Sequence, residues 1–460
     1  MRRKLTILAA VLGLTMFRAN GQVSRDAALL TTEVDSVVRA AVLADQVPGA
    51  VVQIEKDGKV VLSRAYGVSQ KYDIQREPLS PAPPMDTATL FDLASLTKVV
   101  GTTTSLMLLA DQGKIHVDDP VSRYLPGFDT GAKRQITLRH LLTHTAGLYE
   151  WYPLFYRSAH RDSTIRLVES LPLKYPVGRQ RRYSDLGFML LGAVVERVSG
   201  MPLEVFEARY VFGPLGMTHT TYNPLQHGHT TDIAATSLGN PYEYRMTHDS
   251  SLGFLIPGLD PMSWNGWRKY VVKGEVNDGN AWYASEGVSG HAGLFSTVGD
   301  IQRLVDMLMD GGKIAGDGGS RGSGGGRRGA GGGGSGRRSG GGRGGGGGRR
   351  GAGGGGGKVG TRQFISAATI RTFLTPDSFR NGLGWMMDPA NSFMKDAPAG
   401  SFGHTGFTGT SIAVVPSEHL SVIILINRQN IGLQPNQVYY NPNPIRKGVF
   451  ECAQRLGGNR

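Results

Sequence analysis

The sequence predicts an α/β chain of the α+β type. One antiparallel sheet is built from strands near both ends and flanked by helices, with an all-helical subdomain inserted between them. The first observation is a pair of β-rich runs around Asp57-Gly58, a dipeptide typical of a two-residue hairpin turn. The second is a later pair of β-rich runs, His404–Val415 and Leu420–Asn427, which predicts another hairpin turning at 416–419. The third is the long middle, where apolar residues recur with helical period.

The helices can be followed in order along the chain. The first is predicted over Glu33–Leu43, before the first hairpin. The next, Ser95–Gln112, ends at Gly113, a residue type common just after helices. Further helices are predicted over Leu138–Leu142, Asp185–Ser199, Leu203–Val211, Asp300–Met309 and Ile365–Leu374. A cleft between the helical part and the sheet is the expected place for a functional site.

The excess positive charge of the chain comes from two segments. The 460 residues carry a formal net charge of +13, and residues 1–21 and 311–360 together account for all of it. The remaining chain is electrically balanced, so it is not expected to bind nucleic acid through a basic surface. The single cysteine, Cys452, excludes an intramolecular disulfide and zinc sites that need several cysteines.

The N-terminus has the three parts of a secretory signal. Residues 2–4 are basic, residues 5–17 are apolar, and small residues stand at positions 19 and 21. This pattern predicts a signal peptide over residues 1–21, with cleavage before Gln22 and a periplasmic or secreted protein without a membrane anchor. A short buried helix is the alternative interpretation.

Residues 311–360 form a low-complexity insertion within a domain that spans 22–456. They hold 30 of the 67 glycines and eight arginines. Such a composition offers few side chains to bury, and ordering it costs much conformational entropy. The alternatives are a tolerated insertion and an Arg-Gly segment that contacts polyanions.

Three short motifs carry candidate chemistry. In Ser95-Leu-Thr-Lys98 the serine and the lysine are three residues apart, so on a helix the hydroxyl and the amine should meet. This motif alone is weak, because Ser392-Phe-Met-Lys395 also matches it and because Ser95 could be an ordinary helix N-cap.

The second motif, Tyr183-Ser184-Asp185, precedes a long apolar helix. Packing for Tyr183 and an N-cap role for Asp185 are the alternatives there. The third, His404-Thr405-Gly406, opens a predicted strand, where the glycine could simply allow a close backbone approach.

Taken in order, the three motifs resemble those of the serine β-lactamase and penicillin-binding-protein superfamily. The similarity is greatest to class C β-lactamases, DD-peptidases and related esterases, and it implies a β-lactamase/transpeptidase-like fold. Further segments that resemble the family are 91–98, 141–148, 183–192, 214–217, 290–297 and 403–410.

The resemblance implies a mechanism. Ser95 would be the nucleophile that forms an acyl-enzyme, and Lys98 and Tyr183 would activate it. The oxyanion would lie between the backbone N–H groups of Ser95 and Phe407. Asp185 and the His404-Thr405-Gly406 motif would complete the substrate-binding set.

Two residues depart from the family pattern. Asp185 stands where the family has Asn, and a carboxylate there should raise the pKa of Lys98 and keep it charged. Tyr183 is therefore the expected general base. His404 replaces the more common lysine and, if neutral, adds no positive charge to lower the pKa of Tyr183. Together these departures predict a rate profile shifted to alkaline pH and a weak preference for carboxylate-bearing β-lactams.

The sequence thus predicts an exported serine hydrolase acting on D-Ala-D-Ala peptides or esters, with at most weak β-lactamase activity. The alternatives are a non-catalytic penicillin- or peptidoglycan-binding module and polyanion binding through the insertion. No cofactor or metal is expected, although His227, His229 and Asp232 form a loose polar group. His144 is expected to fix a turn. His291 is expected to have a structural role between glycines, and a place at the rim of the cleft is the alternative. Oligomeric state is left open.

Overall fold

The computed structural model describes residues 28–316, 360–388 and 392–456. The predicted signal peptide and most of the predicted insertion lie outside these ranges.

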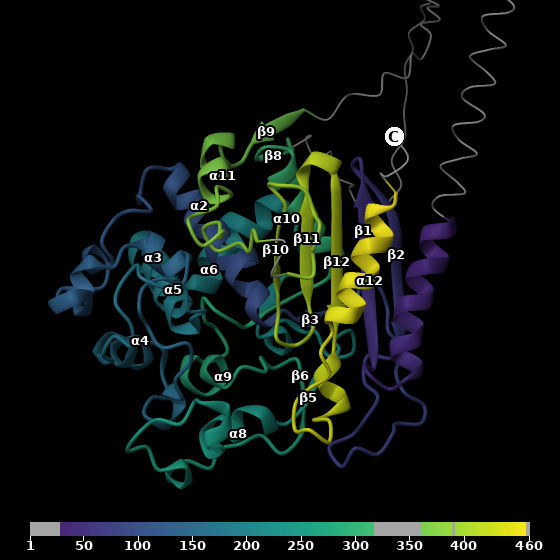
Figure 1. The fold of residues 1–460 in the computed structure, drawn as a ribbon, viewed down its shortest axis with the longest axis horizontal. Helices are drawn as coiled ribbons and strands as arrows, with labels where there is room; N and C mark the ends of the chain where they lie inside the picture. Colours follow the sequence, from purple (N-terminus) through teal and green to yellow (C-terminus); the bar gives the residue numbers. More distant parts are fainter. Residues whose placement is uncertain (1–27, 317–359, 389–391, 457–460) are drawn as a thin grey trace, which may run out of the picture.

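The main sheet joins the two ends of the described chain, as predicted (Figure 1). Its five antiparallel strands run in the order β10-β11-β12-β1-β2. They span Phe402–Thr405 (β10), Ser411–Val415 (β11), Leu420–Ile426 (β12), Gly49–Lys56 (β1) and Lys59–Gly67 (β2). Asp57 and Gly58 make the β1–β2 turn with φ angles of 52° and 70°, the left-handed region that a tight hairpin requires.

The single strand predicted over His404–Val415 is wrong. The chain leaves the sheet after Thr405 and re-enters it at Ser411, so residues 406–410 form the turn between β10 and β11. Gly409 has a φ of 122°, which favours glycine, and a Cβ on Gly406 would lie 2.4 Å from the Leu93 carbonyl oxygen. The glycines therefore mark a turn pressed against another segment rather than a continuous strand.

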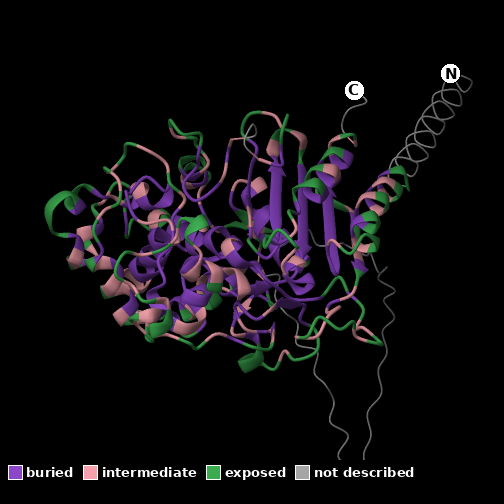
Figure 2. Cartoon of the chain, turned by 60° about the horizontal axis from the view of Figure 1, so that its bottom comes forward, coloured by how far each residue is buried: buried purple, intermediate pink, exposed green. Residues whose placement is uncertain are grey.

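Both faces of the sheet are covered, and the strand residues alternate between two cores. In β12, Val422 and Ile424 pack with the helix at 28–43 and with α12 (Asn443–Gln454), whereas Ile423 and Leu425 face the larger core. Helix α10 (Val298–Met309) covers this second face. Strands β10, β11, β12 and β1 are almost wholly buried as a result (Figure 2), whereas most residues of the edge strand β2 are exposed or half-buried.

The middle of the chain forms a helical part beside the sheet (Figure 1). Its helices are α3 (Leu138–Leu142), α4 (Arg161–Ser170), α5 (Asp185–Ser199), α6 (Leu203–Glu207), α7 (Gly213–Leu215), α8 (Pro241–His248) and α9 (Gly279–Ser285). Helix α11 (Ala367–Phe373) follows the insertion. The helices predicted at 33, 138, 185, 203, 300 and 365 are confirmed, whereas α4, α7, α8, α9 and α12 were not predicted.

An all-helical middle was an oversimplification. Short strands β3 (Phe91–Asp92), β7 (Leu294–Ser296) and β4 (Thr221–Tyr222) form a small sheet, and β5 (Ala235–Leu238) pairs with β6 (Val271–Lys273). These strands have two to four residues each, too few to show a period in the sequence.

The helix predicted over Ser95–Gln112 is helical but not regular. A 3₁₀ turn (Ala94–Leu96) leads into a π-helix (Lys98–Thr103) and only then into α2 (Thr104–Asp111). The Thr104 hydroxyl donates to the Val99 carbonyl five residues earlier (2.9 Å), which takes that carbonyl from the regular α-helical pattern. Such π segments often occur at functional sites.

Strands β8 (Lys313–Ala315) and β9 (Thr361–Gln363) pair with each other and bracket the undescribed part of the insertion. In the described part of the chain, no single helix has the length and apolar composition to cross a membrane. One pair bent by 71°, Asp185–Ser199 with Leu203–Leu215, meets those two conditions.

Candidate active site

A cavity of about 270 Å³ opens between the helical part and the β10 edge of the sheet. Four of the predicted site residues line it: Ser95, Tyr183, Asp185 and Phe407. Lys98, His404, Thr405 and Gly406 are not among the lining residues. The three motifs, far apart in the sequence, therefore meet in space, with some members in the wall and others behind it.

The segment before Ser95 holds an unfavourable backbone conformation. Ala94 has a φ of 46°, a region that residues with a Cβ rarely adopt. Asp92 supports it, because its Oδ1 accepts from the Ala94 N–H (2.8 Å) and its Oδ2 from the Asn277 N–H (2.7 Å). Strain of this kind, held in place by surrounding contacts, is a feature of functional sites.

Lys98 is fully buried, and its ammonium group has three oxygen partners. Nζ lies 3.0 Å from Ser95 Oγ, 2.7 Å from Asp185 Oδ1 and 3.0 Å from the His291 carbonyl oxygen. Burial by itself lowers the pKa of Lys98, but the charge of Asp185 and the interactions with Tyr183 outweigh burial, so the pKa is raised. Lys98 is therefore a cation that donates to the serine hydroxyl, not a free base.

Tyr183 stands beside the Ser95–Lys98 pair. Its ring centroid is 5.1 Å from Lys98 Nζ and 4.4 Å from the His144 ring. Burial raises the pKa of Tyr183, the charge of Lys98 opposes this, and the charge of Asp185 raises the pKa further; hydrogen bonds from Ser95 and Lys98 favour the phenolate. The net direction is upward, so the phenol is neutral at neutral pH.

Local contacts fix the start of α5. Ser184, not Asp185, is the N-cap, since its hydroxyl accepts from the Gly187 N–H (3.3 Å). This leaves the Asp185 carboxylate free to reach Lys98. His144 Nδ1 accepts from the Ser184 N–H (3.1 Å), and His144 itself has a φ of 58°, which confirms its predicted role in a turn.

His404 is 2% exposed and lies behind the cavity wall. Burial, assisted by the charge of Lys98, lowers the pKa of His404 to about 3, so the imidazole is neutral. Its ring is 6.1 Å from the Tyr183 ring. The position therefore contributes no positive charge to the site.

Two residues that line the cavity, Ser95 and Phe407, have backbone N–H groups without a protein acceptor in the described part of the chain. Within residues 28–316, 360–388 and 392–456, neither the Ser95 N–H nor the Phe407 N–H donates to a protein acceptor. Threonine hydroxyls tie the Phe407 turn to the nucleophile segment: Thr408 Oγ1 donates to the Asp92 carbonyl (2.8 Å) and Thr410 Oγ1 to that of Leu93 (3.0 Å). The two free donors are thus carried by segments that are bonded to each other.

A second group of polar residues lies in the cavity wall. It includes His291, which the sequence offered as an alternative lining residue, and Asp278 and Glu243, which sequence reasoning missed. His291 Nε2 contacts Asp278 Oδ1 at 2.9 Å, and both residues line the cavity. Glu243 lies nearby, and burial raises its pKa to about 8, with the charge of Asp278 adding to the effect. Asn277-Asp278-Gly279, directly before α9, was the available sequence signal.

Among the described residues, Asp185, Asp278 and His291 form a group that could hold a metal ion. Their ligand atoms lie within 4.8 Å of one another. However, Asp185 already binds the Lys98 ammonium, and Asp278 already pairs with His291. The polar group proposed around His229 is an exposed contact of its Nδ1 with Asp232 Oδ2 at 2.8 Å. The second Ser-x-x-Lys match, Ser392–Lys395, lies in a turn away from the cavity.

The comparison with known proteins decides the family. A family model described as Beta-lactamase matches residues 34–435. The chain belongs to the beta-lactamase family. This membership confirms the resemblance and the predicted fold, and it confirms the enzyme class, a serine hydrolase related to the β-lactamases.

Curated relatives match over most of the chain. The chain is 32% identical over 427 residues to an N-acetylmuramyl-L-alanine amidase of Bacillus subtilis, covering 88% of this chain and 81% of that protein. It is also 32% identical over 432 residues to a putative D-alanyl-D-alanine carboxypeptidase of Escherichia coli K12, covering 88% and 84%.

Solved structures show the same fold at lower identity. EstCE1, a hydrolase with promiscuous acyltransferase activity, superposes with a TM-score of 0.60 at 20% identity, covering 92% of this chain and 99% of that one. An octameric penicillin-binding protein homologue from Pyrococcus abyssi gives a TM-score of 0.60 at 18% identity, covering 93% and 78%.

Proposed function

We propose that this protein is an exported serine hydrolase that works through an acyl-enzyme on Ser95. One observation carries the proposal: Ser95 Oγ lies in the cavity, 3.0 Å from the Lys98 ammonium, on a segment that also presents a free backbone N–H. A nucleophile, a charged partner and paired N–H donors are the parts that acyl transfer requires. The pattern of residues 1–21 supports export.

In the proposed acylation step, Ser95 Oγ attacks the substrate carbonyl carbon and its proton passes to the Tyr183 phenolate. The Lys98 ammonium stabilises that phenolate, and the N–H groups of Ser95 and Phe407 stabilise the oxyanion. Collapse of the intermediate breaks the bond to the leaving group, which takes the proton from Tyr183. Water then attacks the acyl-enzyme carbonyl and gives a proton to the Tyr183 phenolate. As the bond to Ser95 Oγ breaks, Tyr183 returns that proton to Oγ, which releases the acid and restores the free serine and the phenolate.

The assignment of the base follows from the charges. Lys98 has a raised pKa, so it cannot accept the serine proton at neutral pH. Tyr183 also has a raised pKa, so the phenolate is a minor species and the rate should rise with pH. His404 adds no charge that would favour the phenolate.

We propose D-Ala-D-Ala peptides or small esters as substrates, with at most weak action on β-lactams. The neutral His404 offers no cation for a substrate carboxylate, and Glu150, Asp185, Glu243 and Asp278 all line the cavity. This disfavours carboxylate-bearing β-lactams. Because a D-Ala-D-Ala peptide also ends in a carboxylate, the same observation favours small esters among the two proposed substrate classes. The two curated relatives are named for hydrolysis of amide bonds at alanine residues. A non-catalytic binding module is disfavoured, because the serine, lysine and tyrosine are all present and in contact.

The test is covalent labelling. The protein and its Ser95→Ala variant are treated with a fluorescent penicillin and with a fluorophosphonate, and intact-mass and peptide mass spectrometry locate any adduct. We expect an adduct on Ser95 that the variant lacks. The intact mass of protein purified from a secreting host should also correspond to a chain whose first residue is Gln22. Absence of an adduct with both probes, in protein shown to be folded, would favour the binding-module alternative.

Deleting residues 317–359 separates hydrolysis from polyanion binding. The ends of this segment are already joined by the β8–β9 pairing, with the Gly316 N–H donating to the Gly360 carbonyl at 2.6 Å. A short Gly-Ser link should therefore replace it, and we expect unchanged kcat/KM toward an aryl ester and unchanged Ser95 labelling. A large loss of hydrolysis with the fold intact, measured by circular dichroism, would assign the segment a role in the reaction.

A further inference from the structure

A buried arginine contacts the turn that presents the Phe407 N–H. Arg446 in α12 is 5% exposed. Its Nη2 donates to the Gly406 carbonyl (3.2 Å) and the Thr410 carbonyl (2.9 Å), and its Nη1 donates to Asn443 Oδ1 (3.0 Å). No carboxylate of the described residues forms an ion pair with it. Burying a charge without a counter-ion is costly, so the contacts of this guanidinium with the turn need an explanation.

The peptide geometry links Arg446 to the cavity. The Gly406 carbonyl and the Phe407 N–H belong to one planar peptide unit, and in a trans peptide they point in opposite directions. A guanidinium that holds the carbonyl on the α12 side therefore directs the N–H away from α12. The same positive charge draws electron density toward the carbonyl oxygen, which makes the N–H at the other end a stronger donor.

A second arginine holds the next peptide unit. Arg428 donates to the Phe407 carbonyl from Nε (2.9 Å) and from Nη2 (2.6 Å), and its guanidinium lies 5.0 Å from the centre of the Phe407 ring. Both peptide units that flank the Phe407 Cα are thus fixed by cations. Burial lowers the pKa of Arg446 to about 9 and that of Arg428 to about 10, so both remain charged at neutral pH.

We propose that Arg446 is a positioning residue that orients and polarises the Phe407 N–H as an oxyanion donor, acting through the Gly406 carbonyl. This inference rests on the proposed function, because it requires acyl transfer at Ser95. A merely structural role, in which Arg446 only holds β10 and β11 together, predicts a different kinetic result.

The test compares an oxygen ester with its thionoester, in which sulfur replaces the carbonyl oxygen. Sulfur is a poor hydrogen-bond acceptor, so the ratio of the two kcat/KM values reports on the N–H donors. For Arg446→Met we expect kcat/KM for the oxygen ester to fall about 10–100-fold and the oxygen-to-sulfur ratio to fall about tenfold, since loss of one such donor costs about 10²–10³ in rate. A structural role would lower both rates equally and leave the ratio unchanged, which would overturn the proposal.

A spectroscopic measurement is independent of turnover. The ester carbonyl of the Ser95 acyl-enzyme, observed by isotope-edited infrared difference spectroscopy, should move to higher frequency in Arg446→Met because the carbonyl is less polarised. Should Arg446→Met fail to fold, Arg446→Lys keeps the charge but cannot bridge the Gly406 and Thr410 carbonyls as a guanidinium does. We expect the same two changes in it, at smaller size, and an unchanged ratio and frequency in this variant would also overturn the proposal.

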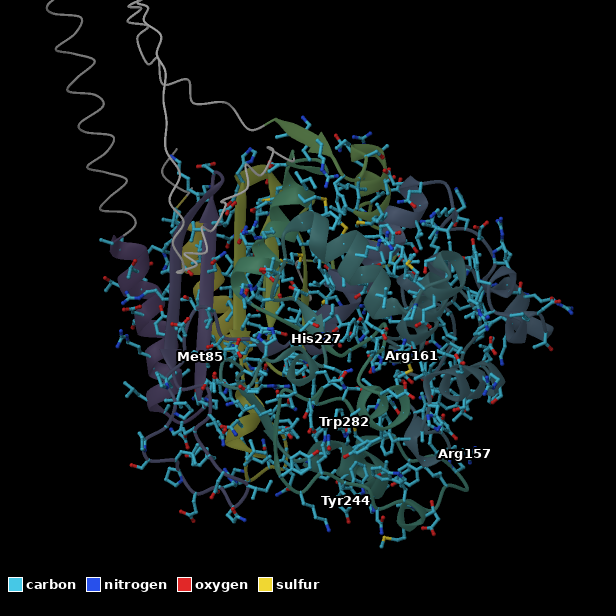
Figure 3. All side chains as sticks on the ribbon, turned by 180° about the vertical axis from the view of Figure 1, so that it is seen from behind. Met85, Arg157, Arg161, His227, Tyr244 and Trp282 are labelled. Atoms are coloured by element: carbon cyan, nitrogen blue, oxygen red, sulfur yellow. The ribbon has the colours of Figure 1, made fainter. Side chains whose placement is uncertain are left out.

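The matched control is Arg161→Met. Arg161 is a largely buried arginine of α4 that binds Glu196 and Glu204 in the helical part, where Figure 3 labels it. Its replacement should leave the oxygen-to-sulfur ratio unchanged. If Ser95 of the wild-type protein is not acylated by the substrate, the proposed function as a whole is contradicted. Two outcomes would contradict this inference alone, provided that Ser95 is acylated. In the first, the wild type shows no difference in kcat/KM between the oxygen ester and the thionoester. In the second, Arg446→Met keeps the wild-type ratio.

Discussion

Replacing Tyr183 with phenylalanine is expected to lower kcat/KM for an ester substrate by about 10²–10⁴-fold, the contribution typical of a general base. The phenyl ring can keep its contact with His144, 4.4 Å away, so the fold should be preserved. Lys98 cannot replace the lost base, because its pKa is raised and its ammonium is engaged by Asp185. Steady-state kinetics measured across pH would also show that kcat/KM no longer rises with pH in the variant.

Tyr149→Phe is the matched control. Tyr149 packs edge-on against Tyr152, with ring centroids 5.8 Å apart, but it is not among the residues that line the cavity. Its variant should retain wild-type kinetics and melting temperature. Near-wild-type kcat/KM in Tyr183→Phe would contradict the assignment and point instead to Lys98 as the base.

Replacing Asp185 with asparagine should move the rising limb of the kcat/KM–pH profile to lower pH and so increase activity near neutral pH. The Asp185 carboxylate raises the pKa of both Lys98 and Tyr183, so its removal lowers both. The rising limb of kcat/KM then moves to lower pH, because this limb reports the base of the free enzyme. We expect kcat/KM at pH 6–7 to increase by about threefold to tenfold.

Asp278→Asn is the comparison variant, since Asp278 also lines the cavity but pairs with His291 rather than Lys98. Its effect on the limb should be smaller. The rising limb of kcat/KM could instead stay in place or move to higher pH in Asp185→Asn while the circular dichroism stays normal. That result would show that the carboxylate does not control the pKa of the base.

The sheet was predictable because its signals are local. Asp57-Gly58 can adopt positive φ at both positions, and alternate residues of β1 and β12 face two cores, so most residues of these two strands are apolar. The break between β10 and β11 was not predictable, because it depends on Leu93, which is remote in sequence and leaves no room for a Cβ on Gly406.

The site was predictable in part. Ser95 and Lys98 are three residues apart, and the structure places their side-chain atoms 3.0 Å apart, as helical spacing predicts. The residues that were missed, Asp278 and Glu243, come from polar segments without a period, and only the tertiary structure brings them to the cavity. The π-helix that begins at Lys98 was missed as well. It is accompanied by the hydrogen bond from the Thr104 hydroxyl to the Val99 carbonyl, which helical periodicity in the sequence does not indicate.

The sequence by itself determined the fold class, the order of the three motifs and the family, because periodicity, turn chemistry and short motifs are written in neighbouring residues. Tertiary structure decided that the His404 imidazole is neutral, and it supplied the contact behind the charge that the sequence predicted for Lys98. Asp185 keeps Lys98 charged, and burial keeps His404 neutral, because charge interactions and desolvation depend on distances between remote segments. It also decided the support of the Phe407 turn, since Arg446 reaches Gly406 from a helix 40 residues further along the chain.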